Sequence, residues 1–383
     1  DIVFGDWSSD VCSSDLGQSV NTGFGASGDC EVNINCSEGS LWQRQKRGVT
    51  RIQVKRGAAS LYCSGSLVNN TLNNGTPYIL TADHCGRLST AIDLSQWVFT
   101  FGYESPACNK PPSEPYLRTM TGATRIASGG ESGSKGSDFF LVKLMQEIPD
   151  SFNVYYNGWS REEAPPDFGV SVHHPQGDIK KISTYTEPVK SVIWPGGTKK
   201  AHWQVRWSET ENGHGATEPG SSGSPLFDGA GHIIGTLTGG DSSCDSASLT
   251  LPDYYGIFSY HWDRNGDDST AQLKPWLDPV GADVMSVNGW ALRVTEHRLS
   301  ETLTVYPNPA EDILFVTVPA NWKGDITYSI SDLYGNRRMN DILEPVSGDG
   351  AMGIDIHHLS PGLYFLVISG ESTRVTRFIK TRP

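Results

Sequence analysis

Glycine and proline interrupt this sequence at short intervals, which limits the chain to short elements of secondary structure. The 383 residues include 42 glycines and 22 prolines, residue types that favour tight turns and disrupt helices. Between them lie short strand-like segments such as 50–54 and 233–237, whereas helical periodicity is scarce. The best helical candidate is segment 271–277, whose length Pro275 restricts. We therefore expect an all-β protein built from many short strands.

Length and charge narrow the classes of function. A chain of 383 residues is too long for one ordinary domain and suggests two. The net charge of −13 argues against nucleic acid or an anionic membrane as the main partner, because both attract basic surfaces. No apolar run approaches the roughly 20 residues of a membrane-spanning helix. Aromatic residues at 10% exclude a disordered chain.

The composition and the pattern of apolar residues change along the chain, and these changes predict four regions. Residues 17–285 form one long region of strands and turns, 286–302 a weakly patterned connector, and 303–383 a set of alternating strands typical of a small β-sandwich. Residues 1–16 stand apart, because Asp6 to Leu16 reads DWSSDVCSSDL. This stretch resembles the in-frame translation of a sequencing-adapter oligonucleotide; the alternative is a disordered extension rich in Ser and Asp.

The seven cysteines indicate disulfides rather than a metal site. No CxxC pair and no Cys/His pair has ligand spacing, and we expect neither a metal nor a cofactor. Wide spacing suits disulfides formed in an oxidising, extracytoplasmic compartment. Leaving out Cys12, which belongs to the adapter-like stretch, gives an even number that could pair in several ways.

A turn rich in glycine and serine, EPGSSGSP at 218–225, is the most informative motif. Such a turn can expose a serine hydroxyl and direct the backbone N–H groups of Gly220 and Ser222 at one point, as an oxyanion hole requires. Alone, it would fit an ordinary loop equally well. However, His84 follows a strand-like segment and Asp138 opens an apolar one. A histidine can act as general base for a serine when a carboxylate fixes its tautomer.

Several ordered motifs resemble those of chymotrypsin-fold serine endopeptidases, and in particular of the bacterial lysyl endopeptidases. The resemblance covers roughly Gly28 to Pro279 and implies two six-stranded β-barrels. It also implies that His84 is the base, Asp138 its orienting carboxylate and Ser222 the nucleophile, with the Gly220 and Ser222 amides as oxyanion hole. The motifs are GDCEVNINC (28–36), CSGSLVNNT (63–71), TADHC (81–85), SDFFLVKL (137–144), TEPGSSGSP (217–225) and LTGGDSSC (237–244).

The same resemblance implies a lysine-selective pocket. Asp253 matches the aspartate that forms the pocket floor, and a buried anion there would offset the desolvation of a substrate ammonium. Trp194 matches a tryptophan beside the pocket. Thr238 stands where the family has a histidine, so we expect Trp194 to lack a stacked imidazole. The resemblance also implies three disulfide pairs: Cys30 with Cys244, Cys36 with Cys108 and Cys63 with Cys85.

Two other patterns are expected to be structural. His173 and His174 are adjacent on a predicted strand, so they would point to opposite faces and could not bind one metal ion together. The acidic run 263–268, DRNGDD, lacks the later glutamate of a calcium loop. We therefore expect that run to be a solvated turn.

The last region resembles the sorting domain of the type IX secretion system. The similarity lies in VYPNPA (305–310), LYGN (333–336) and LSPGLY (359–364). It implies signal-dependent export to the medium or cell surface of a Bacteroidetes-type bacterium, with the secretion machinery as partner. The alternative is a carbohydrate-binding or adhesive sandwich.

These expectations combine into a secreted, monomeric serine endopeptidase that acts on proteins and peptides. It would hydrolyse bonds on the carboxyl side of lysine through an acyl-enzyme. Two alternatives remain open: a trypsin-like protease with Lys/Arg or another preference, and a catalytically silent binding protein displayed on a protease scaffold. Labelling of Ser222 by a fluorophosphonate would distinguish the enzyme from the silent scaffold.

Overall fold

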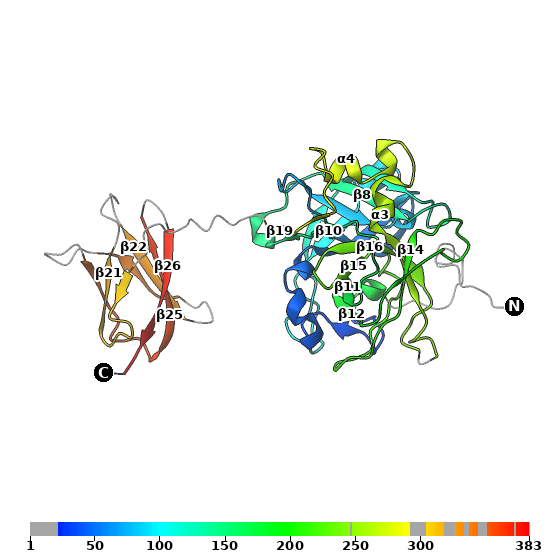
Figure 1. Cartoon of the computed structure of the whole chain (residues 1–383). Coiled ribbons are helices and arrows are strands. Elements are labelled where there is room, and N and C mark those ends of the chain that lie inside the picture. Colours follow the sequence, from blue (N-terminus) through cyan, green and yellow to red (C-terminus); the bar gives the residue numbers. More distant parts are fainter. Residues whose placement is uncertain are drawn as a thin grey trace. The chain divides into compact units, whose positions relative to one another are not determined.

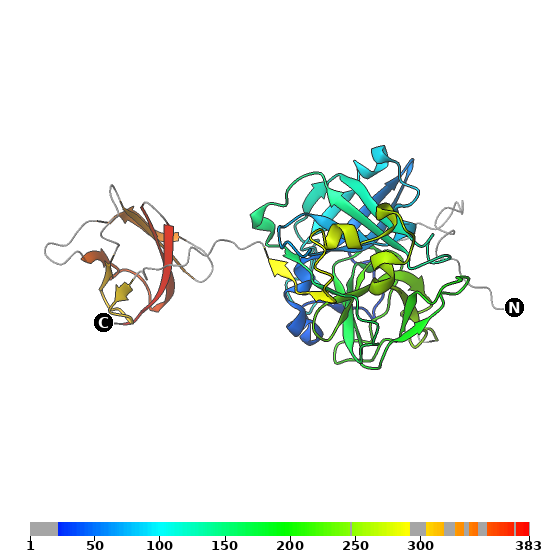
Figure 2. The ribbon, with the colours of Figure 1, turned by 45° about the horizontal axis from the view of Figure 1, so that its top comes forward.

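Two compact units make up the chain, residues 1–292 and 293–383 (Figures 1 and 2). The computed structural model describes residues 22–245, 247–291, 304–317, 326–332, 337–343, 351–370 and 373–382. The adapter-like segment with Cys12, the 333–336 motif and residues 292–302 of the expected connector lie outside this part of the chain. Each unit has an apolar core of its own.

The first half of the first unit is a closed β-barrel. Its strands are β2 (Val49–Arg56), β3 (Ala59–Leu67), β4 (Tyr78–Thr81), β5 (Val98–Phe101), β6 (Arg118–Thr121), β7 (Ala123–Gly129) and β8 (Phe139–Leu144). They follow the order β6-β5-β2-β3-β4-β8-β7. Only Gly122, with a φ of +91°, separates β6 from β7. These two segments therefore act as one bent strand that pairs with both β5 and β8 and closes a six-stranded barrel.

The second half repeats this architecture. Its strands are β11 (Gly169–His173), β12 (Lys181–Tyr185), β13 (Lys190–Val192), β14 (His202–Val205), β15 (Pro225–Asp228), β16 (Ile233–Gly240) and β17 (Asp253–Ile257). The order is β12-β11-β15-β16-β17-β14-β13. Residues 186–189 connect β12 to β13, so these segments again close the ring as one bent strand. The expected all-β fold with two six-stranded barrels is confirmed.

The packing of β8 explains its apolar sequence. Phe140 and Val142 lie in the core of the first barrel, whereas Phe139 and Leu141 belong to a second cluster that also contains Val172 of β11. Because successive side chains of a strand point to opposite faces, an apolar residue is needed at every position of a strand that is buried on both sides. This shared cluster packs the two barrels against each other.

Short elements surround the barrels. The strands are β1 (Val32–Asn33), β9 (Tyr155–Tyr156), β10 (Trp159–Ser160), β18 (Ser286–Val287) and β19 (Trp290–Ala291). The α-helices are α1 (Asp83–Gly86), α2 (Ala91–Leu94), α3 (Phe258–Asp263) and α4 (Lys274–Leu277). The 3-10 helices are η2 (Ser37–Trp42), η3 (Gln45–Arg47), η4 (Asp150–Phe152), η5 (Pro175–Gly177) and η6 (Ser269–Ala271).

Two of these elements differ from the expectations. The helix expected over 271–277 is divided into η6 and α4, because Pro275 starts a new helix near its first turn. The connector expected over 286–302 begins later, because β18 pairs with β10 and β19 pairs with β9. Residues up to Ala291 therefore pack with the first unit.

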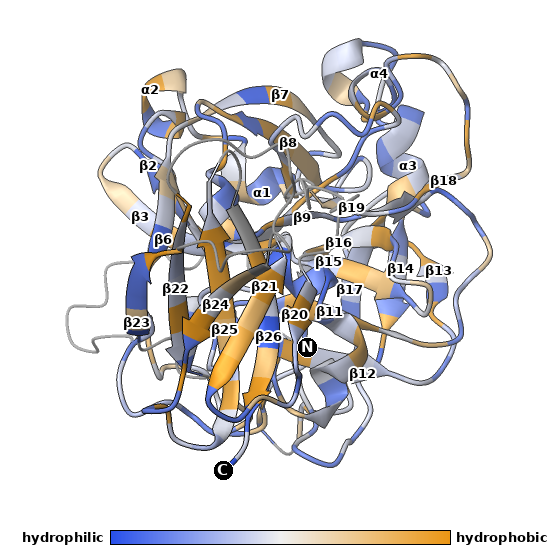
Figure 3. Ribbon diagram, turned by 90° about the vertical axis from the view of Figure 1, so that its left-hand side faces the viewer, coloured by the Kyte–Doolittle hydropathy of each residue, from blue (hydrophilic) through white to orange (hydrophobic). Residues whose placement is uncertain are grey.

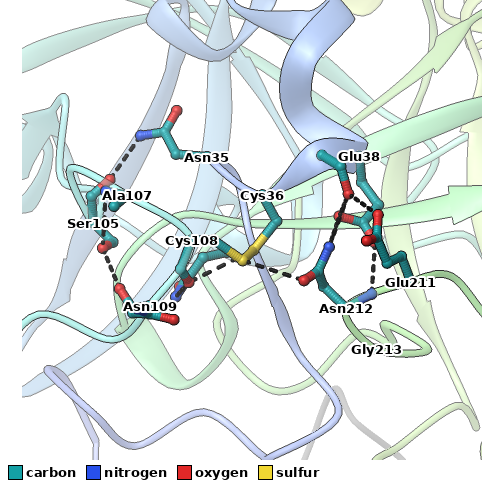
Figure 4. The surroundings of a disulfide bond; sticks show 12 residues. Asn35, Cys36, Glu38, Ser105, Ala107, Cys108, Asn109, Glu211, Asn212 and Gly213 are labelled. Carbon is teal, nitrogen blue, oxygen red and sulfur yellow. Dashed lines mark hydrogen bonds between the residues drawn. A yellow bond between two sulfur atoms is a disulfide. The ribbon is translucent and has the colours of Figure 1, made fainter.

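Three disulfides join segments that are distant in sequence: Cys30–Cys244, Cys36–Cys108 and Cys63–Cys85. These are the pairs that the resemblance implies, and each stabilises a fold by about 2–4 kcal/mol. Figure 4 shows Asn212 beside the Cys36–Cys108 bridge, where its backbone N–H donates to Glu38 Oε1 at 2.9 Å. The amino-terminal segment is thus bound to a loop of each barrel.

The second unit is a β-sandwich. One sheet contains β20 (Thr304–Tyr306), β21 (Ile313–Thr317) and β24 (Ala351–Asp355), and the other β22 (Thr327–Asp332), β23 (Arg337–Ile342), β25 (Gly362–Ser369) and β26 (Thr373–Lys380). Leu314 of β21, Ile330 of β22 and Leu366 of β25 meet in its core, and Figure 3 shows hydrophobic residues along β21 and β25. Among the helices that the structure describes, none is long and apolar enough to cross a membrane.

Candidate active site

His84 and Asp138 lie at the same end of two neighbouring strands. His84 is in α1, which follows β4, and Asp138 immediately precedes β8. Because β4 and β8 are antiparallel, with Thr81 opposite Phe140, the residues that follow β4 lie beside the residue that precedes β8. The sheet pairing therefore brings together two side chains that are 54 positions apart in the sequence.

Two hydrogen bonds join these residues. The backbone N–H of His84 donates to Asp138 Oδ1 at 2.9 Å, and His84 Nδ1 lies 2.7 Å from Asp138 Oδ2. Complete burial alone would raise the pKa of Asp138, but the charge of His84 and its two hydrogen bonds hold this pKa below its ordinary value. A carboxylate can only accept hydrogen bonds, so Nδ1 carries the proton and Nε2 is left as an acceptor.

Of the three serines in the 220–224 loop, Ser222 alone is not fully buried. Ser221 Oγ lies 2.8 Å from His173 Nδ1, and Ser224 Oγ lies 3.3 Å from Ser171 Oγ. These two hydroxyls are engaged inside the second barrel. Ser222 is thus the serine of this loop whose side chain can meet a substrate.

The serine loop is attached to the helix that carries His84. The Ser222 carbonyl accepts a hydrogen bond from Ser64 N at 2.8 Å. Cys63, the neighbour of Ser64, is disulfide-bonded to Cys85, the neighbour of His84. Cys85 Sγ lies 3.9 Å from the Ser222 carbonyl oxygen. The disulfide and the hydrogen bond therefore bring residue 222 to α1 across the junction of the two barrels.

The backbone of the same loop requires a glycine at position 220. Gly220 has a φ of +97°, and a Cβ there would lie 2.8 Å from His174 O, so only glycine fits. Among the described residues, no acceptor is hydrogen-bonded to the N–H of Gly220 or of Ser222. Two unpaired N–H groups beside an accessible hydroxyl can stabilise an oxyanion.

The two histidines expected to be structural lie beneath this loop. His173 bridges Ser221 Oγ and, at 3.0 Å through Nε2, Ser183 Oγ. Burial lowers the pKa of His173 to about 3, so the imidazole stays neutral. The backbone N–H of His174 donates to Ser64 Oγ at 2.9 Å. Both residues support the serine loop from the second barrel.

Asp253 is fully buried at the start of β17 and receives hydrogen bonds from uncharged groups. Trp207 Nε1, Thr217 Oγ1 and Ser242 Oγ donate to its Oδ2 at 2.6, 2.8 and 2.6 Å. Among the described residues, its Oδ1 accepts only from Ser242 N, at 3.2 Å. Gly240 makes room for this carboxylate, because a Cβ there would lie 2.1 Å from Oδ1. Burial raises the pKa of Asp253 to about 6, although these donors oppose the shift.

The expectation that Trp194 lacks an imidazole neighbour is wrong. The ring of His202, on β14, lies 5.7 Å from the ring of half-buried Trp194. His202 Nε2 is 3.0 Å from Thr238 Oγ1, so the threonine holds a histidine that comes from another strand. Tyr254 packs edge-on against Trp194 at 5.3 Å. Burial lowers the pKa of His202 to about 4, so this imidazole is neutral at pH 7.

Sequence reasoning missed an amino-terminal strap, residues 23–28, that runs behind the serine loop. Gly25 N and Ser27 Oγ donate to the two carboxylate oxygens of Asp178 at 2.7 and 2.6 Å. Gly28 N lies 3.2 Å from both oxygens of Glu218, which begins the EPGSSGSP motif. Apart from the Ser27 hydroxyl, the donors are backbone N–H groups of a glycine-rich segment, so the residue types in the sequence do not signal these contacts.

Within the described part of the chain, two side-chain groups are close enough to hold a metal ion: Glu31, Glu218 and Cys244 in the first unit, and Asp355, His357 and His358 in the second. In the first group the cysteine sulfur is already bonded to Cys30. The second group is exposed and lies in the sandwich. Neither group includes His84, Asp138 or Ser222.

Comparisons with known proteins agree with these observations. Residues 24–256 match the family model "Lysyl endopeptidase, C-terminal domain". A curated lysyl endopeptidase of Pseudomonas aeruginosa is 30% identical over 251 residues, which are 62% of this chain and 51% of that protein. The chain thus spans about half the length of this relative.

Two solved structures are similar at low identity. The active form of the Rv3671c protease of M. tuberculosis is 13% identical, with a TM-score of 0.40 over 65% of this chain and 89% of that chain. The protease Anisep of Arthrobacter nicotinovorans is 16% identical, with a TM-score of 0.37 over 55% of this chain and 90% of that chain.

The second unit has a match of its own. Residues 304–381 match the "Secretion system C-terminal sorting domain", the tail of proteins that Bacteroidetes export by type IX secretion. The protein is accordingly secreted or held at the cell surface. The first match covers more than half of the chain, and it shows that the chain belongs to the lysyl endopeptidase family.

Proposed function

We propose that the chain hydrolyses peptide bonds on the carboxyl side of lysine, with Ser222 as nucleophile, His84 as base and Asp138 as the carboxylate that orients the base. One observation carries this proposal: buried Asp138 holds His84 Nδ1 at 2.7 Å, which leaves Nε2 free to accept a proton. Ser222, the half-buried serine of the adjoining loop, supplies the hydroxyl.

The reaction follows from these positions. Ser222 Oγ attacks the substrate carbonyl carbon while its proton passes to His84 Nε2. The N–H groups of Gly220 and Ser222 donate to the resulting oxyanion. The C–N bond breaks, and the amine leaves with the proton from His84. Water then attacks the acyl-enzyme by the same steps, which releases the acid and restores Ser222.

Asp253 supports a preference for a cationic side chain. A substrate ammonium entering a dry pocket loses its water shell, and a buried carboxylate offsets that cost. Three donors already occupy Oδ2, whereas Oδ1 accepts one hydrogen bond within the described part of the chain, from the Ser242 amide. A guanidinium prefers two parallel acceptors, and an ammonium needs only one. This arrangement favours lysine over arginine and over an uncharged side chain.

The proposed partners follow from the two units. The protease unit would act as a monomer on protein and peptide substrates, and the sorting domain would engage the type IX secretion machinery. These assignments are proposals for the whole protein, because the chain spans about half the length of its curated relative.

A digest of a reduced and alkylated protein, with the new termini read by mass spectrometry, tests the proposal. We expect termini after lysine, no cleavage by Ser222→Ala, and fluorophosphonate labelling of the parent alone. Termini after lysine and arginine alike would replace the lysine preference by a trypsin-like one. A folded parent that neither cleaves nor takes the label would leave the silent scaffold as the function.

A further inference from the structure

Asn265 belongs to the acidic run 263–268, which was expected to be a solvated turn, but its side chain is half-buried. The nearest charged residues before and after it in the sequence, Arg264 and Asp267, are exposed. Gly129 and Gly136 lie against Asn265, because a Cβ at these glycines would come within 2.7 and 2.0 Å of its side-chain atoms. Asn265 is therefore inserted into the loop that leads from β7 to Asp138.

The amide group of Asn265 forms hydrogen bonds to that loop and to α3. Its Oδ1 accepts from the backbone N–H of Ser137 at 3.0 Å, and its Nδ2 donates to Ser137 Oγ at 2.8 Å. A longer contact of 3.2 Å runs from Nδ2 to the carbonyl of Tyr260 in α3. One side chain thus fixes both the backbone and the hydroxyl of the residue that precedes Asp138.

Asp138 needs such support because its backbone is strained. Its φ of +58° lies in the left-handed region, which costs free energy for a residue other than glycine and persists only where surrounding contacts enforce it. That conformation sets the direction of the carboxylate toward His84. A small rotation would separate Oδ2 from Nδ1 and Oδ1 from the His84 amide.

Other contacts complete a socket for the Ser137–Asp138 peptide. His261 Nδ1 lies 2.7 Å from Ser137 Oγ, and His261 Nε2 lies 3.0 Å from Thr236 Oγ1. Gly256 leaves space for the Ser137 carbonyl, because a Cβ there would lie 1.6 Å from that oxygen. Among these residues, Asn265 is the one that comes from the 263–268 turn, and it contacts the Ser137–Asp138 peptide through Ser137.

We propose that Asn265 is a positioning residue that acts through Asp138. It holds the Ser137–Asp138 peptide so that the carboxylate keeps both hydrogen bonds to His84. This inference rests on the proposed function of the triad. Its consequence is a loss of turnover without a loss of substrate binding when the Asn265 amide is removed.

A double-mutant cycle distinguishes this role from a general effect on folding. kcat and KM for a lysine amide are measured for the parent, Asn265→Ala, Asp138→Asn and the double variant, with melting temperatures for each. We expect Asn265→Ala to lower kcat on the order of ten- to a hundred-fold, the effect of a small misplacement of a catalytic group, with KM within about twofold. In the Asp138→Asn background the same change should lower kcat by less than about threefold.

Two further variants complete the test. Asp267→Asn, in the same exposed turn, should keep the parental kcat. Asn265→Asp keeps an oxygen for the Ser137 amide and loses the donated bonds, so it should lose less kcat than Asn265→Ala; it also serves if the alanine variant fails to fold. An equal fold-loss in both backgrounds, or parental kcat in Asn265→Ala, would overturn the inference. Full activity of Asp138→Asn would instead refute the proposed triad.

Discussion

The charge of Asp253 should control the preference for lysine, and the structure gives this control a pH dependence. The carboxyl is fully buried and its pKa is raised to about 6. Below that pH the free enzyme carries a neutral acid in the proposed pocket, which cannot offset the desolvation of a substrate ammonium. Lysine preference should therefore decline as the pH falls through about 6.

The size of the effect follows from the loss of a buried pair. Removing one partner of such a pair costs roughly 3–5 kcal/mol, so Asp253→Asn should lower kcat/KM for a lysine amide by about a hundred-fold or more. An amide with norleucine in place of lysine has a similar shape and no charge. Its hydrolysis should change little, because the variant leaves Ser222, His84 and the oxyanion-hole amides intact.

The assay is the ratio of kcat/KM for the lysine and norleucine amides between about pH 4.5 and 8. Any effect of pH on the catalytic step acts on both substrates alike and cancels in the ratio. For the parent, the ratio should be level above about pH 7 and fall roughly tenfold per pH unit well below the Asp253 pKa. For Asp253→Asn it should be low and independent of pH.

Stability should change in the opposite direction. A carboxyl whose pKa rises from 3.8 to about 6 on folding is favoured in its protonated form, so its contribution is complete below pH 3.8 and is lost as the pH rises through about 6. At 1.36 kcal/mol per pKa unit, this loss is about 3 kcal/mol. The melting temperature of Asp253→Asn relative to the parent should therefore rise between about pH 4 and 6 and then level off.

Two results would refute the reasoning. Cleavage after lysine by Asp253→Asn at the parental rate would place the pocket anion elsewhere and leave a serine endopeptidase of unknown preference. A lysine-to-norleucine ratio that does not change between about pH 4.5 and 8, in a parent enzyme that prefers lysine, would show that Asp253 is ionised throughout. The substitution and the titration therefore test the charge separately.

Three further predictions concern the nucleophile and the two ends of the chain. Ser222→Ala should lower kcat on the order of a million-fold with an unchanged melting temperature; near-parental turnover by a pure sample would exclude Ser222 as nucleophile. A chain ending at Ala291, after β19, should cleave a lysine amide at a rate similar to the full chain, and a folded but inactive product would mean that the sandwich shapes the site. Deletion of residues 1–21 should leave kcat/KM unchanged, whereas deletion through Ser27 removes three donors to Asp178 and should lower kcat; equal rates for both deletions would show that the strap does not support the serine loop.

The residues of the proposed site could be predicted because each lies in a short motif whose local chemistry is distinctive. Ser222 lies between a serine and a glycine in a turn, and Asp138 begins a strand that is buried on both faces. Such features depend on neighbours along the chain, so the sequence displays them. The barrel fold, by contrast, was inferred from the resemblance, because no single segment of the sequence determines the order of the strands in a sheet.

The imidazole beside Trp194 could not be predicted in this way. Thr238 stands where the family has a histidine, so we expected that no imidazole lies beside Trp194. That expectation considered only the strand that carries Thr238. His202 lies on β14, which pairs with β17, while Thr238 lies on β16 on the other side of β17. The two side chains meet across the middle strand, where Gly256 is the partner of His202 and has no side chain. Only the order of strands in the sheet reveals this contact.

Asn265 escaped prediction for a related reason. The charged residues of the run are exposed, so the run resembled a solvated turn, and only the packing of α3 directs one amide inward. His261 and Asn265 both lie beyond residue 256, where the family match ends. Two of the side chains that hold the Ser137–Asp138 peptide are thus outside the matched region. Members with the same Ser, His and Asp can consequently differ in kcat through this turn, and the Asn265→Ala cycle measures how much of the rate depends on it.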